Sequence, residues 1–381
     1  MQNLSVLVQG RQAGVLVGKA QRYAMKLGAS FQLHGLLFAM VGLYVALVYY
    51  VQYLIGGEVS LDPISVLQGK ISTLILPLML IGIFFIRLFN MIVFVRPEHP
   101  LSYLASDVGG FFLKPSRLLV AIPTTIAVIY FVQCYSSIKH AIPFVQAFSW
   151  DVTFMELDRA LHFGMDPWRI LQPVLGFWWV TTFINFCYNV WFLVLWFVLV
   201  SLAFSDRNFA LRLQYFVSFT LTWMIGGSIL AMVFSSAGPA YYGLLGLGPD
   251  PYKDLMSYLH GAHELGNVPA LTTQALLWES WQNGNKGIVA GISAMPSMHN
   301  ATTVLLALLG WRVSRFWGIA GTVFAAIILV GSVHLGWHYA VDGYLGIAIA
   351  LSVWWVSGHL VRWYLALPFM QERLAIIREG E

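Results

Sequence analysis

Two histidines and one aspartate in the C-terminal half of the chain are the residues best suited to chemistry. His299 ends the stretch "AMPSMH", and His338 and Asp342 begin and end the stretch "HYAVD". If a helix already begins near His338, the four-residue spacing puts the imidazole and the carboxylate on one helical face. The carboxylate can then accept a hydrogen bond from one ring nitrogen. That bond would fix the tautomer and leave the other nitrogen free as a nucleophile.

A second histidine extends this chemistry, because His299 could protonate a departing oxygen and later take the proton of an incoming hydroxyl. Pro296 fixes the chain that enters the next helix, and Ser297 can cap that helix. The NH groups of its first turn would then face a bound phosphate. An isolated PSxH or HxxxD pattern is more often a capped or hydrogen-bonded pair. The two patterns together, on one predicted side of a membrane, favour catalysis on a phosphoester.

The elements that must position these residues are membrane helices. Of the 381 residues, 59% are hydrophobic and 10% are charged, and the mean hydropathy is +0.73; an average soluble domain carries roughly 25% charged residues. Stretches of about 18 or more apolar residues can cross a bilayer. The predicted spans are 31–54, 71–95, 118–138, 177–203, 213–235, 298–311, 317–338 and 341–366, the sixth being the shortest. The sequence therefore predicts an all-α, polytopic membrane bundle of about eight transmembrane helices.

The distribution of basic residues predicts the orientation of this bundle. With eight spans both termini lie on one side, and most of the 21 lysines and arginines lie in the segments on that side. The positive-inside rule then puts the termini in the cytoplasm and the histidine motifs on the outer (periplasmic or lumenal) side of a plasma or inner membrane. The first 30 residues are basic, contain no acid and lack a compact apolar core. They are predicted to form a basic amphipathic helix on the inner leaflet, not a signal peptide.

A short helix is predicted on the outer side, within residues 150–171. Asp151 is a possible N-cap, and Asp158 would lie at the margin of the helix. The apolar face would hold three residues at helical spacing, Phe154, Leu157 and Leu161. Such an amphipathic helix would lie at the membrane interface, either as an ordinary connector or as a lid over substrate.

A long loop, 236–297, follows on the same predicted side and is long enough to favour a functional role. Tyr241 and Tyr242 fall near its start, at the depth of the lipid headgroups. Polar side chains inside the fourth predicted span are expected to tie helices together; they are Asn185, Tyr188 and Asn189. The two cysteines, Cys134 and Cys187, fall at different depths and predict buried thiols, with no disulfide and no metal cage.

The two histidine motifs resemble the second and third motifs of the type 2 phosphatidic acid phosphatase superfamily. The likeness is greatest to its branch of inositol phosphorylceramide synthases and related inositolphosphotransferases, and it covers roughly 170–366. The resemblance implies a six-helix phosphatase-like core in which His338 is the nucleophile that forms a phosphohistidine. It also implies that Asp342 orients this ring, that His299 is the acid and base, and that no metal or other cofactor takes part.

This resemblance divides the chain into four predicted parts. They are a basic amphipathic segment (1–30), accessory transmembrane helices (31–140), a phosphatase- or phosphotransferase-like membrane domain (141–366) and a cytoplasmic tail (367–381).

The sequence departs from the lipid phosphatases of this superfamily at the residues that hold phosphate. Those enzymes carry Lys, six residues and then Arg-Pro, and an arginine six residues before the nucleophilic histidine. Here Ser332 stands at the second position, and the sole Arg-Pro pair, at Arg96, has Phe89 in place of the lysine. The usual phosphate clamp is therefore missing, which favours transfer to an alcohol over hydrolysis.

Another cation must then offset the phosphate charge, and the sequence offers Lys286, Lys139 and Arg159 on the predicted outer side. Each could equally be a solvated surface charge. His334 could line the same site or be hydrogen-bonded within the bundle.

The resulting hypothesis is an integral-membrane lipid phosphotransferase that moves a phospho-headgroup from a lipid donor to a hydroxyl acceptor such as ceramide, diacylglycerol or polyprenol. Its nearest alternative is a lipid phosphate phosphatase with water as the acceptor. A metal site built from His334, His338 and Asp342 and a non-catalytic transporter or scaffold are further alternatives. The expected partners are membrane lipids and not nucleic acid. The net charge of +4 is explained by the excess of basic residues on the predicted cytoplasmic side of the membrane.

Overall fold

The part of the chain that the structure describes folds into helices and contains no strand. The computed structural model describes residues 2–58, 61, 76–284 and 291–379. Six helical units within these residues are long and apolar enough to cross a membrane: α2 (Gly35–Ile55), α6 (Pro115–Val145), α9 (Trp178–Ala203), Phe209–Val233, α15 (Arg315–His334) and α16 (Ala340–Ala366). The predicted all-α, polytopic membrane bundle is therefore confirmed.

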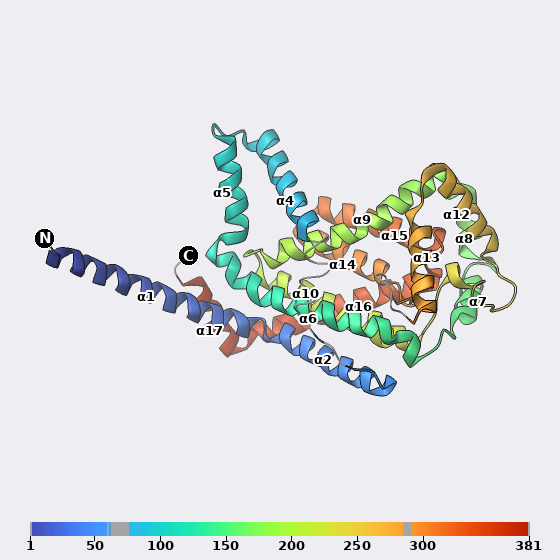
Figure 1. Cartoon of the computed structure of the whole chain (residues 1–381), viewed down its shortest axis with the longest axis horizontal. Helices are drawn as coiled ribbons and strands as arrows, with labels where there is room; N and C mark the ends of the chain where they lie inside the picture. The colour runs from blue at the N-terminus through green and yellow to red at the C-terminus, as the bar shows by residue number, and fades with distance from the viewer. Residues whose placement is uncertain (1, 59–60, 62–75, 285–290, 380–381) are drawn as a thin grey trace.

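Two of the eight predicted spans are not among these six units. Helix α14 (Met298–Val313) has 16 residues, which extend over roughly 24 Å, less than the roughly 30 Å of a hydrocarbon core. The predicted span 71–95 is described only in part, as α4 (Leu76–Asn90) and the π-helical turn η2 (Met91–Val95). Figure 1 shows α4 and α5 (Pro100–Leu113) standing out from the side of the bundle.

Small residues let α15 and α16 pack closely against α14. A Cβ atom at Gly321 of α15 would lie 2.7 Å from the Cα atom of Ala307, and one at Gly346 of α16 would lie 2.5 Å from the carbonyl oxygen of Ser297. Glycines at such positions allow helix backbones to approach in a membrane bundle. This packing fixes the N-terminal end of α14, where His299 lies.

The termini and the candidate catalytic residues lie at opposite ends of the molecule. Figure 1 shows the N- and C-termini at one end and a cap of short helices at the other. The cap contains α7 (Asp151–Leu161), α8 (Pro167–Leu175), the short turn η4 (Pro239–Tyr241), α12 (Lys253–Gly266) and α13 (Pro269–Gln282). Helices α14 and α16 both begin at the cap end, so their first turns lie near one another.

A continuous unit, Phe209–Val233, crosses the bundle as α10 (Phe209–Met224), a π-helical segment η3 (Ile225–Leu230) and the short α11 (Ala231–Val233). At the opposite end from the cap, α1 (Gln2–Leu33) precedes α2, and α17 (Pro368–Arg378) follows α16. The ammonium group of Lys26 donates to the carbonyl oxygen of Ile377 at 3.0 Å. Figure 1 shows α1 continuing away from the bundle rather than folding across its end. Its location on the inner leaflet and the four domain boundaries stay predictions.

Helix α7 is present where the interfacial helix was predicted, but a different face is buried. Leu157 and Leu161 are 42% and 56% exposed, whereas Asp151 and Asp158 are 1% and 2% exposed. The N-cap is Trp150, not Asp151. The predicted apolar face is therefore only partly correct, because the two carboxylates turn inward to bind backbone NH groups of neighbouring segments.

Candidate active site

His338 and Asp342 meet at the start of α16. Helix α15 ends at His334 and α16 begins at Ala340, so His338 lies in the link between them. Nδ1 of His338 is 3.2 Å from Oδ2 of Asp342, and the same oxygen accepts the N–H of Tyr339 at 3.0 Å. The pairing does not come from a shared helical face, as the spacing predicted, because Asp342 reaches back past the helix start. A proton on Nδ1 can be donated to this carboxylate, which leaves the lone pair of Nε2 available.

The turn before His338 is fixed by its backbone. The N–H groups of Trp337 and His338 both donate to the carbonyl oxygen of Ser332 at 3.0 Å. Gly336 has a φ of 71°, in the left-handed region that glycine adopts without steric cost. The sequence between the two helices therefore holds His338 at one place in the bundle, where its side chain is nearly buried.

Asp158 of α7 binds the first turn of α16 from outside. Its two carboxylate oxygens accept the N–H groups of Ala340 at 2.8 Å and Val341 at 2.9 Å. A carboxylate is favoured at this place because the unpaired N–H groups carry the positive end of the helix dipole. Burial raises the pKa of the Asp158 carboxyl to about 6, and the two hydrogen bonds oppose that rise only in part. This residue holds the segment that carries His338 and Asp342.

Asp151 adds a second link between α7 and the site. It accepts the hydroxyl proton of Tyr339 at 2.8 Å and the N–H groups of Ala237 and Gly238 at 2.9 and 2.8 Å. Burial raises the pKa of Asp151 as well. The carboxylate thereby joins α7, the start of the long loop and the residue next to His338.

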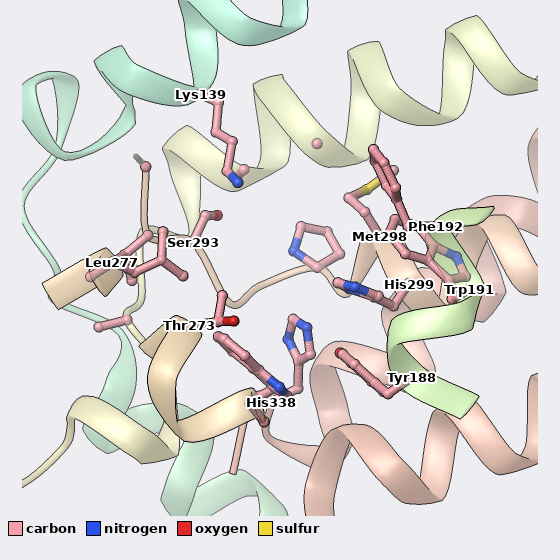
Figure 2. A pocket seen from close by; sticks show the side chains of 18 of the residues that line it. Lys139, Tyr188, Trp191, Phe192, Thr273, Leu277, Ser293, Met298, His299 and His338 are labelled. Atoms are coloured by element: carbon pink, nitrogen blue, oxygen red, sulfur yellow. The ribbon is translucent and has the colours of Figure 1, made fainter. Parts of the chain in front are cut away.

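His299 lies in the first turn of α14 and is held by two aromatic rings of α9. Its ring centroid is 4.5 Å from that of Tyr188, with the planes 23° apart, and 4.0 Å from that of Trp191. The centroids of His299 and His338 are 6.1 Å apart. Figure 2 shows both histidine side chains at one cavity, with Tyr188 beside them. One phosphoryl group between the rings would be within reach of both.

The cavity has a volume of about 390 Å³ and is bounded by membrane helices and the long loop. Its polar lining includes Lys139, Asn189, Thr273 and Ser293 in addition to the histidines. The lining also includes aromatic and small residues of α6, α9, α10 and η3, namely Tyr135, Trp191, Phe192, Trp223 and Gly227. The cavity therefore presents both polar and apolar side chains to a ligand.

The charge of the lining suits an anion. Among the described residues that line the cavity, Lys139 is the one lysine or arginine, and no aspartate or glutamate is present. Asp342 lies behind His338 and is fully buried. A phosphate would thus meet cationic and neutral groups, while the carboxylate acts on the far side of the imidazole.

The structure brings only some of the remaining predicted residues to the cavity. Pro296 and Tyr241 line it. Ser297 is fully buried, and its hydroxyl oxygen accepts from the N–H and side-chain amide of Asn300 at 3.5 and 3.0 Å. It caps α14 as predicted, but it does not line the cavity. Tyr242 is buried against Tyr252, and Lys286 lies outside the described residues.

His334 lies apart from the cavity. Its Nε2 atom is 2.9 Å from the hydroxyl oxygen of Thr181, and its side chain is fully buried. The metal-site alternative required one unbroken helix from His334 to Asp342, but the helix breaks between them. In the described ranges, no three histidine, cysteine, aspartate or glutamate side chains gather as potential metal ligands.

The polar residues of α9 divide between packing and the site. The side-chain oxygen of Asn185 accepts the N–H of Ala270 at 3.1 Å, which ties α9 to α13. Asn189 lines the cavity, and its amide donates to the carbonyl oxygen of Asn185 at 2.8 Å. Tyr188 contacts His299, a role that sequence reasoning missed because an aromatic residue in a membrane span resembles a packing residue.

Comparison with protein-family models gives a match. The family model described as "PAP2 superfamily" matches residues 152–356, a little over half of the chain. No curated protein and no solved structure matches. The matched segment runs from α7 into α16 and contains His299, His338 and Asp342, whereas α2 and α6 precede it.

Proposed function

Because this chain belongs to the PAP2 superfamily, whose members act as phosphatases or phosphotransferases on phosphoesters, we propose that it is an integral-membrane lipid phosphotransferase. It moves a phospho-headgroup from a lipid donor to a hydroxyl acceptor through a phosphohistidine intermediate. The observation that carries this proposal is that His299 and His338, with ring centroids 6.1 Å apart, line one cavity. Both termini lie in the cytoplasm in this proposal, and the cavity opens on the outer side.

The first half-reaction forms the phosphohistidine. Nε2 of His338 attacks the phosphorus atom of the donor, and a P–N bond forms while the P–O bond to the lipid alcohol breaks. His299 gives its proton to the departing alcohol oxygen. Asp342 holds the Nδ1 proton of His338 and stabilises the positive charge that develops on the ring.

The second half-reaction transfers the group to the acceptor. His299 is now neutral and takes the proton of an incoming hydroxyl, whose oxygen attacks the phosphorus atom. The P–N bond breaks, and His338 returns to its starting form. Both histidines therefore end the cycle as they began it, so no redox group is needed to balance the reaction.

The apolar lining of the cavity supports a lipid as substrate. Aromatic side chains of α6, α9 and α10 line it together with the histidines. An acyl chain can lie along this surface while the phosphate stays at the imidazoles, because burial of hydrocarbon is favourable there and the membrane supplies the chain. Two lipid substrates can then reach the same phosphorus atom without leaving the bilayer.

The acceptor experiment separates transfer from hydrolysis. Purified protein in detergent micelles is incubated with phospholipid labelled in its headgroup phosphate, with and without ceramide, diacylglycerol or polyprenol. The proposal predicts label on at least one of these acceptors with wild type and none with His338→Ala. Release of free phosphate or headgroup phosphate alone, unchanged by any acceptor, would contradict transfer and support the phosphatase alternative.

A further inference from the structure

The cavity has one wall that lies outside the family match. Helix α6 precedes residue 152, yet its residues Tyr135 and Lys139 line the cavity together with the histidines. Figure 2 shows Lys139 extending from α6 into the cavity on the side across from Tyr188. The cavity is therefore lined by the accessory helix α6 as well as by helices of the matched segment.

Of the three cations that the sequence offered for the phosphate, the described structure brings one to the cavity. Arg159 instead pairs with Asp166, with nitrogen–oxygen distances of 2.6 and 3.2 Å, and it does not line the cavity. Lys286 lies outside the described residues. Lys139 lines the cavity together with His299 and His338.

The loop before α14 fits closely against Lys139. Gly291 has a φ of 84°, and a Cβ atom there would lie 2.8 Å from both Cγ and the carbonyl oxygen of Lys139. A lysine near the end of a membrane helix normally extends toward the interface. Here the backbone at Gly291 packs on the stem of the side chain.

Building on the proposed function, we propose that Lys139 of the accessory helix α6 is the phosphate-binding cation of this site and that Gly291 is its positioning residue. The ligand class is the phosphoryl group of a phosphoester or free inorganic phosphate, which share the same anionic oxygens. A cation fixed beside these oxygens lowers the energy of the charge that they carry in the transition state. Lys139 takes the place of the lysine and arginine that the lipid phosphatases carry in their motifs and that this sequence lacks at those positions.

The test measures phosphate binding apart from turnover. Lys139→Met keeps the length of the stem and removes the charge. It is expected to lower kcat/KM for phospholipid and to raise the inhibition constant of inorganic phosphate by roughly 10- to 100-fold each. Lys139→Arg should recover part of both losses. Lys253→Ala, which removes an exposed lysine of α12 at the same end of the molecule, is the matched control and should change neither.

Gly291→Ala gives an independent variant. It should weaken phosphate inhibition when Lys139 is present and have no further effect on it in the Lys139→Met protein, because the two residues act as one unit. Unchanged phosphate inhibition in Lys139→Met, or equal losses from Gly291→Ala in both backgrounds, would overturn the inference. Protection against thermal unfolding by inorganic phosphate reports the same binding without turnover. This measurement therefore distinguishes failure of the phosphate-binding proposal from failure of the phosphohistidine mechanism.

Discussion

Two clusters of buried ionisable and polar groups lie at opposite ends of the bundle. The carboxylate cluster, at the start of α16, consists of Asp151, Asp158 and Asp342, and the anchor cluster consists of Arg212, His34 and Thr124. Carboxylates of the first accept backbone N–H groups, and the guanidinium of the second donates to backbone carbonyl oxygens. Both clusters use the backbone to satisfy charge that a membrane protein otherwise excludes.

The anchor cluster joins the accessory helices to the matched segment. The Arg212 guanidinium on α10 donates to the carbonyl oxygens of Leu202 at 2.9 Å and Val120 at 2.5 Å. Two of its nitrogens lie 3.0 Å from Nε2 of His34, and one also contacts Thr124. No carboxylate pairs with Arg212 in the described part of the chain. This cluster is closed on all sides by α6, α10 and the junction of α1 with α2.

The two clusters are equally buried, but they differ in whether a ligand can reach a group that they contact. Asp342 is as buried as Arg212, but it contacts His338, whose other side faces a cavity. A buried ionisable group in a membrane bundle therefore marks chemistry only where it acts on a group that a ligand can reach. Elsewhere the same burial stabilises helix packing. Variants in the two clusters should consequently separate turnover from stability.

The largest effect is expected at the histidines of the cavity. His338→Ala removes the proposed nucleophile and should lower turnover of phospholipid by roughly 10⁴-fold or more, with little change in Tm. His299→Ala should lower turnover by roughly 10²- to 10⁴-fold. The matched control is His334→Ala, a buried histidine outside the cavity, which should lower Tm and keep turnover within a few-fold of wild type. Loss of turnover in His334→Ala equal to that in His338→Ala would contradict this assignment.

The next effect tests the carboxylate cluster. Asp342→Asn removes the negative charge behind His338 and should reduce turnover by roughly 10²-fold or more, since the carboxamide can present an N–H to Nδ1 and favour the wrong tautomer. The measurement is turnover per folded protein, with Tm determined on the same samples. A lowered Tm together with unchanged turnover per folded protein would show that Asp342 only supports packing.

The anchor cluster should respond in the opposite way. Arg212→Met removes the buried hydrogen bonds from the guanidinium to the carbonyl oxygens of Leu202 and Val120, each contributing about 1.5 to 3 kcal/mol, so Tm in detergent should fall by several degrees. Turnover per folded protein should stay within a few-fold of wild type, because the cavity lies at the other end of the bundle. A loss of turnover comparable to that of Asp342→Asn, at temperatures where the variant is folded, would break the comparison.

The smallest effect concerns pH and Asp158. The folded protein raises the pKa of this carboxyl from 3.8 to about 6 through burial. The group therefore stabilises the fold most below pH 3.8, and that contribution is lost as pH rises through about 6. Asp158→Asn cannot ionise, so its Tm should fall less than that of wild type between pH 4 and pH 7. Parallel Tm curves for the two proteins would contradict the assignment.

The residues that we propose to act on phosphate could be identified from the sequence, whereas the residues that hold them in place could not. His299, His338 and Asp342 stand in two short motifs, and their meeting follows from the alternation of the predicted spans. Asp151 and Asp158 were assigned to the N-cap and margin of an interfacial helix, because helical periodicity shows spacing but no distant partners. The N–H groups that Asp158 binds belong to residues more than 180 positions away.

The helices themselves were predicted well where composition decides them. The six long spans lie close to their predicted positions, since length and apolar content control both. The choice of Lys139 over Arg159 could not be made, because it depends on how α6 packs against the loop before α14. The spacing of the leucines in α7 likewise predicted the wrong buried face, because the face that carries Asp151 and Asp158 packs inward instead.

The most direct test of the central claim is to identify the phosphorylated residue. Wild-type protein is mixed with phospholipid labelled in its phosphate, quenched within milliseconds in alkali and digested for mass spectrometry. The account predicts label on the imidazole of His338, stable in base and lost in acid, and none on His338→Ala. Label on another residue, or full turnover by His338→Ala, would contradict it.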